Sequence, residues 1–249
     1  MDVEAPRVTP RQRRRADKLE RILDTAFTLV VRDGVDAFTI RDLAQEMGFA
    51  VGAVYRYYRS KDALLAALQV RVIRALGASI ERQRAGAAAL ADDRGLDPRP
   101  ADLLALISVG TLYARLSSTD PETFQLLSMV LGDPRRLLED EDASEVVHAA
   151  LSVLTQVSEL FERAAARGAL EAGPPLDRAV VFWSALQGLA QNEKLQRVAP
   201  RQLDGARLVP ELITTLLRGW GATRDDLDRA TTHQSKHPQP QLQLQGSAP

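Results

Sequence analysis

The stretch from Thr39 to Lys61, TIRDLAQEMGFAVGAVYRYYRSK, constrains the fold more than any other part of the sequence. Its first half has apolar residues at helical spacing directly after Thr39, whose hydroxyl is a natural N-cap. Gly48 then ends this helix, because glycine adopts the left-handed conformation of a helix C-terminus at low cost. A second helical pattern begins within three residues. The spacing predicts a helix-turn-helix, whose second helix enters the major groove of DNA.

Positive charge is concentrated in the same part of the chain. Residues 1–74 hold 14 Lys and Arg against 10 Asp and Glu, a net charge of +4, whereas residues 75–249 hold 18 against 23, a net charge of -5. The cations are densest between Arg7 and Arg21. They would follow phosphates or enter a minor groove, or else form a solvated tail. We predict a basic, flexible arm over residues 1–15.

The order of the motifs in this region resembles that of a known family. ILDTAFTLVVRDG, TIRDLAQEMG, VGAVYRYY and SKDALL follow one another over about residues 16–66. In this order they resemble the DNA-binding domain of the TetR (tetracycline repressor) family of bacterial transcription regulators. The resemblance implies an all-α protein with a three-helix DNA-binding domain at residues 16–62. A helical effector-binding and dimerisation domain would follow at residues 63–229.

The resemblance also implies three groups of DNA contacts. One group touches the DNA backbone or groove edge, one faces bases at the start of the second helix, and one holds phosphates. The residues that face bases offer no side-chain hydrogen bonds, so thymine methyls or DNA shape would be read there, and Arg41 and Arg56 become the polar readers. Thr39 and Arg41 are the contacts to the backbone or groove edge, Val51, Gly52 and Ala53 face the bases, and Tyr55, Tyr57 and Lys61 hold phosphates.

Two residues depart from the family pattern. Ala50 stands where the family often has a serine N-cap, so this cap and its phosphate contact are missing. Tyr58 replaces a phenylalanine, which requires its hydroxyl to reach water or a partner.

Length and composition describe a chain of ordinary size without thiol chemistry. At 249 residues and 45% apolar content, it has enough apolar residues for a small domain and a larger one. It contains no cysteine, which excludes disulfides and cysteine nucleophiles and suits the cytoplasm. No secretory leader and no apolar run of about 20 residues stands out. We expect a cytoplasmic protein without membrane contact.

Beyond residue 61 the sequence predicts helices throughout. Apolar residues recur at every fourth position from Leu64 to Ile80, which indicates a long helix leading away from the DNA-binding domain. A break around residues 92–100 precedes a helix at about residues 101–117. The tail, residues 230–249, is rich in Gln and Pro and is predicted to be disordered. His233 and His237 lie in it at i, i+4 spacing, but a pair in such a tail is a weak metal site, and we expect no metal.

Two late segments have the composition of an association surface. Residues 176–196 are apolar nearly all round, and residues 206–220 carry a clean apolar stripe. Pro210 lies either at the start of this last helix or at a kink within it. The family resemblance implies that both helices pair with their copies in a homodimer, which presents two second helices to a palindromic operator. The alternative is an intramolecular core.

The middle helices are expected to hold a small-molecule effector, as the resemblance implies. Candidate ligand contacts are polar or aromatic residues among apolar neighbours, because effector pockets combine apolar walls with a few orienting groups. Core packing is the alternative for each of them. These candidates are Tyr113, Phe124, Gln125, Met129, His148, Trp183 and Gln187, with Asn192 as a further one.

Two other classes of function compete with DNA binding. An enzyme finds little support, because no phosphate-binding glycine loop or nucleophile motif is present and no cofactor is implied. Glu139 and Asp142 are predicted to lie in a helix-flanking loop, where carboxylates cap helices more often than they catalyse. A helical adaptor for proteins, or a diverged regulator that no longer reads DNA, is the second alternative. The sequence therefore favours a DNA-binding transcription regulator, by family analogy a repressor.

Overall fold

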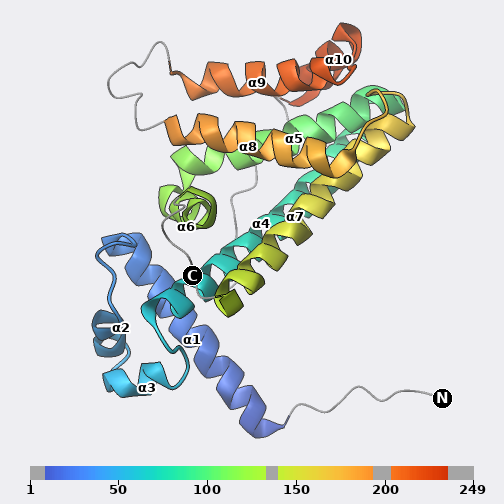
Figure 1. The fold of residues 1–249 in the computed structure, drawn as a ribbon. Coiled ribbons are helices and arrows are strands. Elements are labelled where there is room, and N and C mark those ends of the chain that lie inside the picture. The colour runs from blue at the N-terminus through green and yellow to red at the C-terminus, as the bar shows by residue number, and fades with distance from the viewer. Residues whose placement is uncertain (1–8, 133–139, 193–202, 235–249) are drawn as a thin grey trace, which may run out of the picture.

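A computed structural model describes residues 9–132, 140–192 and 203–234, and within these ranges the chain forms ten helices and no strand (Figure 1). The all-α fold predicted from the sequence is confirmed. The helices are α1 (Pro10–Asp33), α2 (Ile40–Glu46), α3 (Val51–Tyr55), α4 (Lys61–Asp93), α5 (Pro98–Thr119), α6 (Pro121–Gly132), α7 (Asp140–Ala166), α8 (Pro175–Gln191), α9 (Gly205–Gly219) and α10 (Arg224–Gln234).

Helices α1, α2 and α3 form a small N-terminal unit with its own apolar core. Thr39 caps α2 by accepting a hydrogen bond from the Asp42 amide at 3.2 Å, and Gly48 turns the chain toward α3 with φ +66°. The predicted helix-turn-helix is confirmed. Core side chains of this unit that are at most 1% exposed include Ile22, Leu29, Phe38, Leu43 and Val54.

The prediction of a flexible arm is wrong for residues 10–15, which the structure describes as helical. Helix α1 begins at Pro10, so residues 10–15 are helical, while residues 1–8 lie outside the described residues. Thr9 and Gln12 form a capping box, and Pro10 occupies the first helical position, where its missing N–H has no consequence. These signals begin the helix earlier than the charge pattern alone suggests.

Helix α4 connects the N-terminal unit to the rest of the chain and spans about 50 Å. It lies beside α7 along much of its length (Figure 1). One 18-residue window of α4 is long and apolar enough to cross a membrane, but 72% of that window is buried inside the protein. Burial in the core accounts for its hydropathy. The residues of the every-fourth pattern, from Leu64 to Ile80, are all buried.

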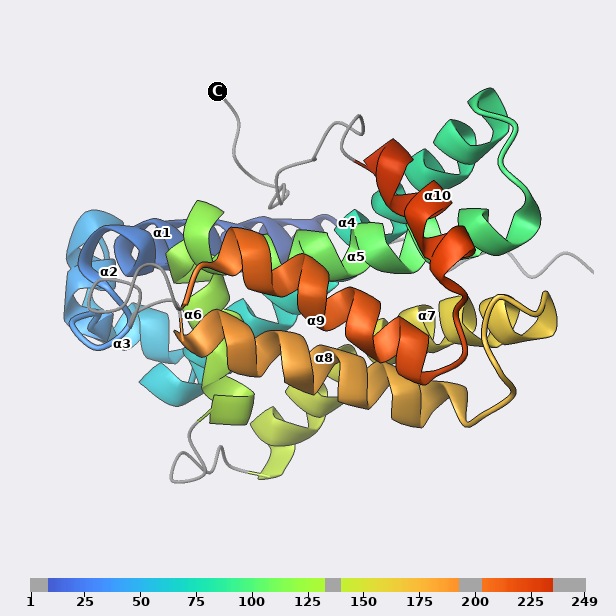
Figure 2. The ribbon, with the colours of Figure 1, turned by 90° about the horizontal axis from the view of Figure 1, so that it is seen from above.

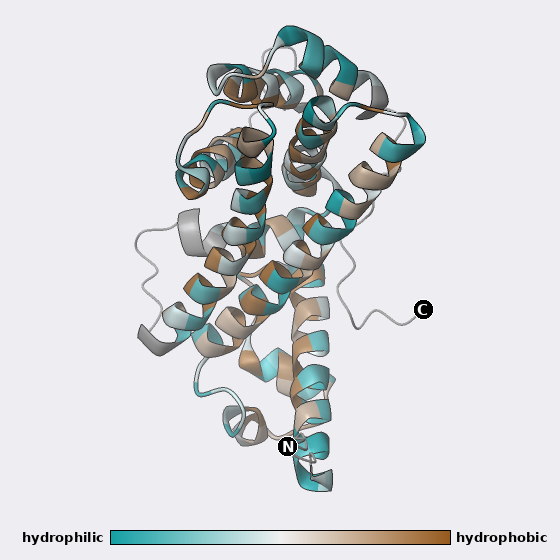
Figure 3. Cartoon of the chain, turned by 90° about the vertical axis from the view of Figure 1, so that its right-hand side faces the viewer, coloured by the Kyte–Doolittle hydropathy of each residue, from teal (hydrophilic) through white to brown (hydrophobic). Residues whose placement is uncertain are grey.

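Helix α5 lies at the centre of the C-terminal part and packs against α4, α7, α8, α9 and α10. It extends slightly beyond the predicted residues 101–117, because Pro98 starts it one turn earlier. Helices α8 and α9 lie side by side over α5 (Figure 2). Hydrophobic faces meet between neighbouring helices, whereas the outer turns are hydrophilic (Figure 3).

The structure shows where α9 and α7 begin. Asp204 caps α9 by accepting from the Ala206 amide at 3.0 Å, so Pro210 lies inside this helix. Helix α7 begins at Asp140, so the prediction of a loop through Asp142 is wrong, and Glu139 lies outside the described residues.

Predicted disorder is also wrong at residues 230–234, which belong to α10. Thr223 accepts from the Asp226 amide at 3.2 Å at the start of α10, and Leu227 and Ala230 are buried against the protein. Helix α10 packs on α5, and this tertiary contact stabilises a segment of low intrinsic hydrophobicity. Residues 235–249 lie outside the described residues.

Candidate functional site

Helix α3 presents its N-terminal end to solvent. Val51 and Gly52 are exposed, Ala53 is half-buried, and Val54 is fully buried and fixes the helix on its core. Ala50 is the N-cap residue and makes no side-chain cap hydrogen bond, as its side chain requires. The exposed start of α3 is therefore a smooth surface of small apolar groups.

Two arginines flank this surface. Arg41 on α2 and Arg56 at the end of α3 are exposed, and neither is paired with a carboxylate within the part of the chain that the structure describes. Tyr55, predicted to hold a phosphate, is 49% exposed. An unpaired guanidinium donates several hydrogen bonds in a fixed plane, which suits phosphates and the acceptor edge of guanine.

The hydroxyl of Thr39 is already used within the protein. Besides accepting from the Asp42 amide, it donates to the Asp42 carboxylate at 2.6 Å. Its first role is therefore to begin α2, and a DNA contact would use its remaining acceptor capacity.

Tyr57 and Lys61 are less exposed than the sequence suggested. Tyr57 is half-buried and packs against the core, with the Lys18 ammonium 6.0 Å from its ring centre. The Lys61 ammonium lies 3.5 Å from the Asp36 carbonyl oxygen and 5.8 Å from the Phe38 ring centre. These contacts place both side chains at the edge of the α3 surface.

Tyr58 packs behind the same surface. It is half-buried against the core, and burial raises the pKa of its phenol to about 12, with the nearby Glu20 carboxylate acting in the same direction. The side chain is therefore accommodated as a neutral phenol.

The first turns of α1 add a feature that the prediction of a flexible arm missed. Arg11, Arg13, Arg14 and Arg15 are exposed on a helix whose first turn contains no acidic residue. Cations at a helix N-terminus are unfavourable for the helix dipole, so an external anion would offset this arrangement. This end of α1 lies at the same end of the molecule as α3 (Figure 1). The Thr9 to Gln12 capping box is the sequence signal that would have placed these arginines on a helix.

An ion pair links the N-terminal unit to α7. Arg59, in the connection between α3 and α4, pairs with Asp142 in the first turn of α7 at 2.9 Å. Arg71 of α4 similarly pairs with Asp24 of α1 at 2.5 Å. The orientation of the N-terminal unit is therefore fixed by contacts with two long helices of the C-terminal part.

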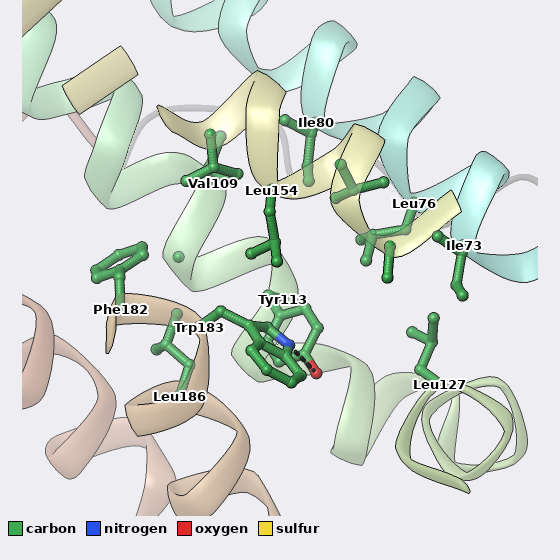
Figure 4. Close-up of a pocket in the computed structure, with 14 residues that line it drawn as sticks. Ile73, Leu76, Ile80, Val109, Tyr113, Leu127, Leu154, Phe182, Trp183 and Leu186 are labelled. Atoms are coloured by element: carbon green, nitrogen blue, oxygen red, sulfur yellow. Dashed lines mark hydrogen bonds between the residues drawn. The ribbon is translucent and has the colours of Figure 1, made fainter. Parts of the chain in front are cut away.

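A cavity of about 110 Å³ lies between α4, α5, α7 and α8 (Figure 4). Twelve of its 14 lining residues have hydrocarbon side chains or none, and the exceptions are Tyr113 and Trp183. Trp183 Nε1 donates to Tyr113 Oη at 3.0 Å, and Tyr113 Oη donates to Gln187 Oε1. Gln187 Nε2 then donates to Ser128 Oγ at 2.8 Å. Burial raises the pKa of Tyr113 to about 12, so its hydroxyl keeps this hydrogen.

The structure separates the remaining predicted ligand contacts. Phe124 packs edge-on against Tyr113, and Gln187 binds Tyr113 from behind, so both support the wall of the cavity without being part of it. Gln125 is exposed, and Asn192 is exposed in a shallow groove between α8 and α9. Neither residue lines this cavity.

Two further candidates, His148 and Met129, belong to α7 and α6. His148 is exposed and lies in a different, polar groove between α4 and α7, where its Nδ1 is 2.6 Å from the Ser144 carbonyl oxygen. His148 therefore does not line the apolar cavity. Met129 belongs to α6, but its side chain lies outside the described residues.

Sequence reasoning missed most of the cavity wall. These aliphatic residues share the spacing of ordinary core residues, so no sequence signal distinguishes them. The missed lining residues are Ile73, Leu76, Ile80, Val109, Gly110, Leu127, Ala150, Val153, Leu154, Val157, Phe182 and Leu186.

Helix α8 exposes apolar side chains on the face turned away from the cavity. Leu176, Val180 and Val181 are 43%, 39% and 50% exposed. Leu208 and Leu212 of α9 are half-buried and line a shallow groove against α8. These five residues of the two helices are here called the α8–α9 face, a candidate association surface. The part of the predicted segment at residues 193–196 lies outside the described residues.

Comparison with known proteins identifies the N-terminal unit. Residues 22–68 match the family described as bacterial regulatory proteins, tetR family. This segment of the chain is therefore similar to the N-terminal domain of tetR-family regulators. Over 49 residues the chain is 43% identical to the uncharacterized HTH-type transcriptional regulator YerO of Bacillus subtilis (strain 168). This match covers 20% of the chain and only 17% of that relative.

Solved structures extend the likeness to the C-terminal part of the chain. A protein of unknown function from Rhodococcus sp. RHA1 is 26% identical, with a TM-score of 0.59 over 81% of this chain and 94% of its own. A tetR-family regulatory protein from Rhodococcus RHA1 is 18% identical, with a TM-score of 0.57 over 82% and 97%. FadR from Bacillus subtilis, solved with stearoyl-CoA, is 16% identical, with a TM-score of 0.55 over 80% and 98%. The last two show a shared fold.

Proposed function

We propose that this protein is a cytoplasmic transcription regulator of the TetR family that binds a palindromic operator as a homodimer and is released when a small molecule occupies the cavity. The observation that carries the proposal is the exposed start of α3 between two unpaired arginines, Arg41 and Arg56. The exposed arginines at the start of α1 extend the positive surface at this end. Phosphate contacts from such residues supply affinity, and α3 supplies position in the major groove.

Base reading by α3 would depend on shape and methyl contacts. Val51, Gly52 and Ala53 bring no side-chain donor or acceptor to the groove, so close approach of the helix to thymine methyl groups is their contribution. Arg41 and Arg56 would supply the hydrogen bonds that distinguish bases. Tyr55, Tyr57, Lys61 and Thr39 would hold the DNA backbone on either side.

The α8–α9 face supports dimerisation. A solvent-exposed apolar face of this kind on two packed helices is typical of an association surface. A two-fold axis through it would relate two copies of α3, which must sit about 34 Å apart to reach successive major grooves on one side of DNA.

Release from DNA would follow from differential binding. Two of the helices that line the cavity, α4 and α7, are also joined by ion pairs to α1 and to the connection that follows α3. A ligand that binds one spacing of the two α3 helices better than the other shifts the population toward that spacing. The stearoyl-CoA of the FadR relative shows that a protein of this fold can bind a small molecule.

Selection from a pool of random duplex DNA at two salt concentrations tests the proposal. We expect a palindrome to be enriched, with affinity that falls as salt rises because phosphate contacts release counterions. Arg41→Ala should weaken binding and alter the preferred sequence, whereas Lys61→Ala should weaken binding to all sequences. Arg94→Ala, at the far end of α4, is the matched control and should leave affinity unchanged.

The same experiment separates the alternatives. A protein-binding adaptor would enrich no sequence at low salt and would tolerate both substitutions. Unchanged DNA affinity in both Arg41→Ala and Lys61→Ala would overturn the assigned surface.

A further inference from the structure

The polar groups of the cavity wall are connected in one direction. Trp183 Nε1 is a donor only, so its hydrogen bond to Tyr113 fixes the order of the whole chain. Tyr113 must then use its single hydrogen on Gln187, whose amide donates to Ser128, whose hydroxyl donates to the Phe124 carbonyl at 2.8 Å. Each of the four donor groups in this chain therefore has an acceptor.

This order leaves the cavity without a free side-chain donor. Among the described residues that line it, Trp183 Nε1 and Tyr113 Oη are the only side-chain heteroatoms, and both hydrogens are engaged. Tyr113 Oη accepts one hydrogen bond and therefore retains one lone pair. The phenol of Tyr113 is neutral at physiological pH, and burial raises its pKa further, to about 12.

No charged side chain is among the lining residues that the structure describes. A carboxylate, phosphate or ammonium group inside it would lose its hydration and gain no ion pair, which is strongly unfavourable. The volume of about 110 Å³ also limits size. A dry apolar cavity of about 150 Å³ accepts benzene, so one small ring is the scale of ligand that fits with little rearrangement.

We propose that the cavity selects uncharged, largely hydrocarbon molecules of about one ring, and that a polar group on such a ligand is recognised as a hydrogen-bond donor to Tyr113 Oη. The proposal rests on the proposed function only for its biological role, because binding itself is measurable without DNA. Phenol is a donor of the right size, and toluene is nearly the same shape without the donor. Benzaldehyde is an acceptor, and benzoate is its charged counterpart.

NMR titration of the full-length protein provides the test. The chain contains two tryptophans, so the Trp183 indole N–H signal can be assigned with a Trp220→Phe variant and followed during titration. We expect saturable shifts with toluene and phenol, and none with benzoate at equal concentration. Ala150→Leu, which fills the cavity, should abolish these shifts, whereas Ala166→Leu, exposed at the far end of the same helix, should keep them.

Tyr113→Phe tests the assigned direction of the hydrogen bond. The variant removes the acceptor and frees the Trp183 donor. Because the phenol oxygen can itself accept, the affinity of phenol is compared with that of the pure acceptor benzaldehyde, and this ratio should fall about two- to tenfold. The affinity of benzaldehyde relative to toluene should rise by a similar factor. Because both readouts are ratios within one variant, a general loss of stability does not imitate them.

Specific results would overturn the inference. Benzoate binding as tightly as phenol, retention of binding in Ala150→Leu, or unchanged ratios in Tyr113→Phe would each do so. Enrichment of an operator without binding of any neutral probe would overturn the ligand class and leave DNA recognition intact. Binding of phenol without any effect on operator affinity would support the ligand class and overturn only ligand-driven release.

Discussion

Replacing Arg59 and Asp142 singly and together measures how firmly the DNA-binding unit is joined to α7. The two side chains form a 2.9 Å ion pair and are 45% and 19% exposed, so the pair is closer to a surface ion pair than to a buried one. Pairs of this kind contribute about 0.2–1 kcal/mol, which corresponds to at most about 4 °C in Tm for a chain of this size. We expect Arg59→Gln and Asp142→Asn to be non-additive by that amount.

Thermal unfolding of the four proteins at about 0.05 and 0.5 M salt is the assay. The non-additivity should shrink at the higher salt, because the exposed part of the pair is screened. Asp142→Asn keeps the positive charge of Arg59, so a lower operator affinity in this variant reports the loss of the ion pair between the two residues. The operator affinity should fall by at most about fivefold. Glu81→Gln breaks the exposed Arg84 pair within α4 and should leave operator affinity unchanged.

Two results would refute the reasoning about this ion pair. Additive Tm shifts at both salt concentrations would show that the pair contributes no coupling. A loss of operator affinity above tenfold in Asp142→Asn would show that Asp142 does more than hold Arg59.

Three other perturbations follow from the structure. Thr39→Ala removes the α2 cap and should lower the free energy of unfolding by about 1 kcal/mol, whereas Ala50→Ser supplies the absent α3 cap and should raise it by a similar amount in urea unfolding. The pKa of both Tyr58 and Tyr113 is raised to about 12 in the folded protein. The stability of the fold that depends on these phenols being neutral is fully present below pH about 10 and is lost as pH rises through 12. Absorbance titration should show two late phenolates that disappear in the Tyr→Phe variants. Val181→Glu on the exposed α8–α9 face should dissociate the dimer in sedimentation experiments without unfolding the chain; a dimer that survives the change would exclude this face.

The sequence predicts the helix-turn-helix well because its signals are local. Thr39 is a cap and Gly48 adopts φ +66°, and both act within a few residues of their position. Helix α10 escaped prediction for the opposite reason. Its apolar residues are few, and Leu227 is buried only because α5 supplies the partner surface from far along the chain.

The cavity shows the same division between local and tertiary information. Tyr113 and Trp183 stand out in the sequence as polar aromatics in apolar helices, and both line the cavity. Leu154 lines it equally, but its sequence pattern is that of any core residue. His148 was chosen for its residue type, and only the rotation of α7 shows that it faces a different groove.

The size of the cavity also limits how strongly a one-ring ligand can act on DNA binding. A ligand present at ten times its Kd stabilises the state it prefers by a factor of at most about eleven for each site, even with no affinity for the other state. Two sites in a dimer raise this limit to about 120-fold when both must be filled. Complete release from a tight operator therefore requires a ligand that binds well enough to reach concentrations far above its Kd.

A larger ligand would bind more tightly by burying more of its own surface, which requires a wall helix such as α4 or α7 to move outward. Both of these helices are tied by ion pairs to the DNA-binding unit or the connection beside it. Tighter binding by a larger ligand and stronger release from DNA would then have one structural cause.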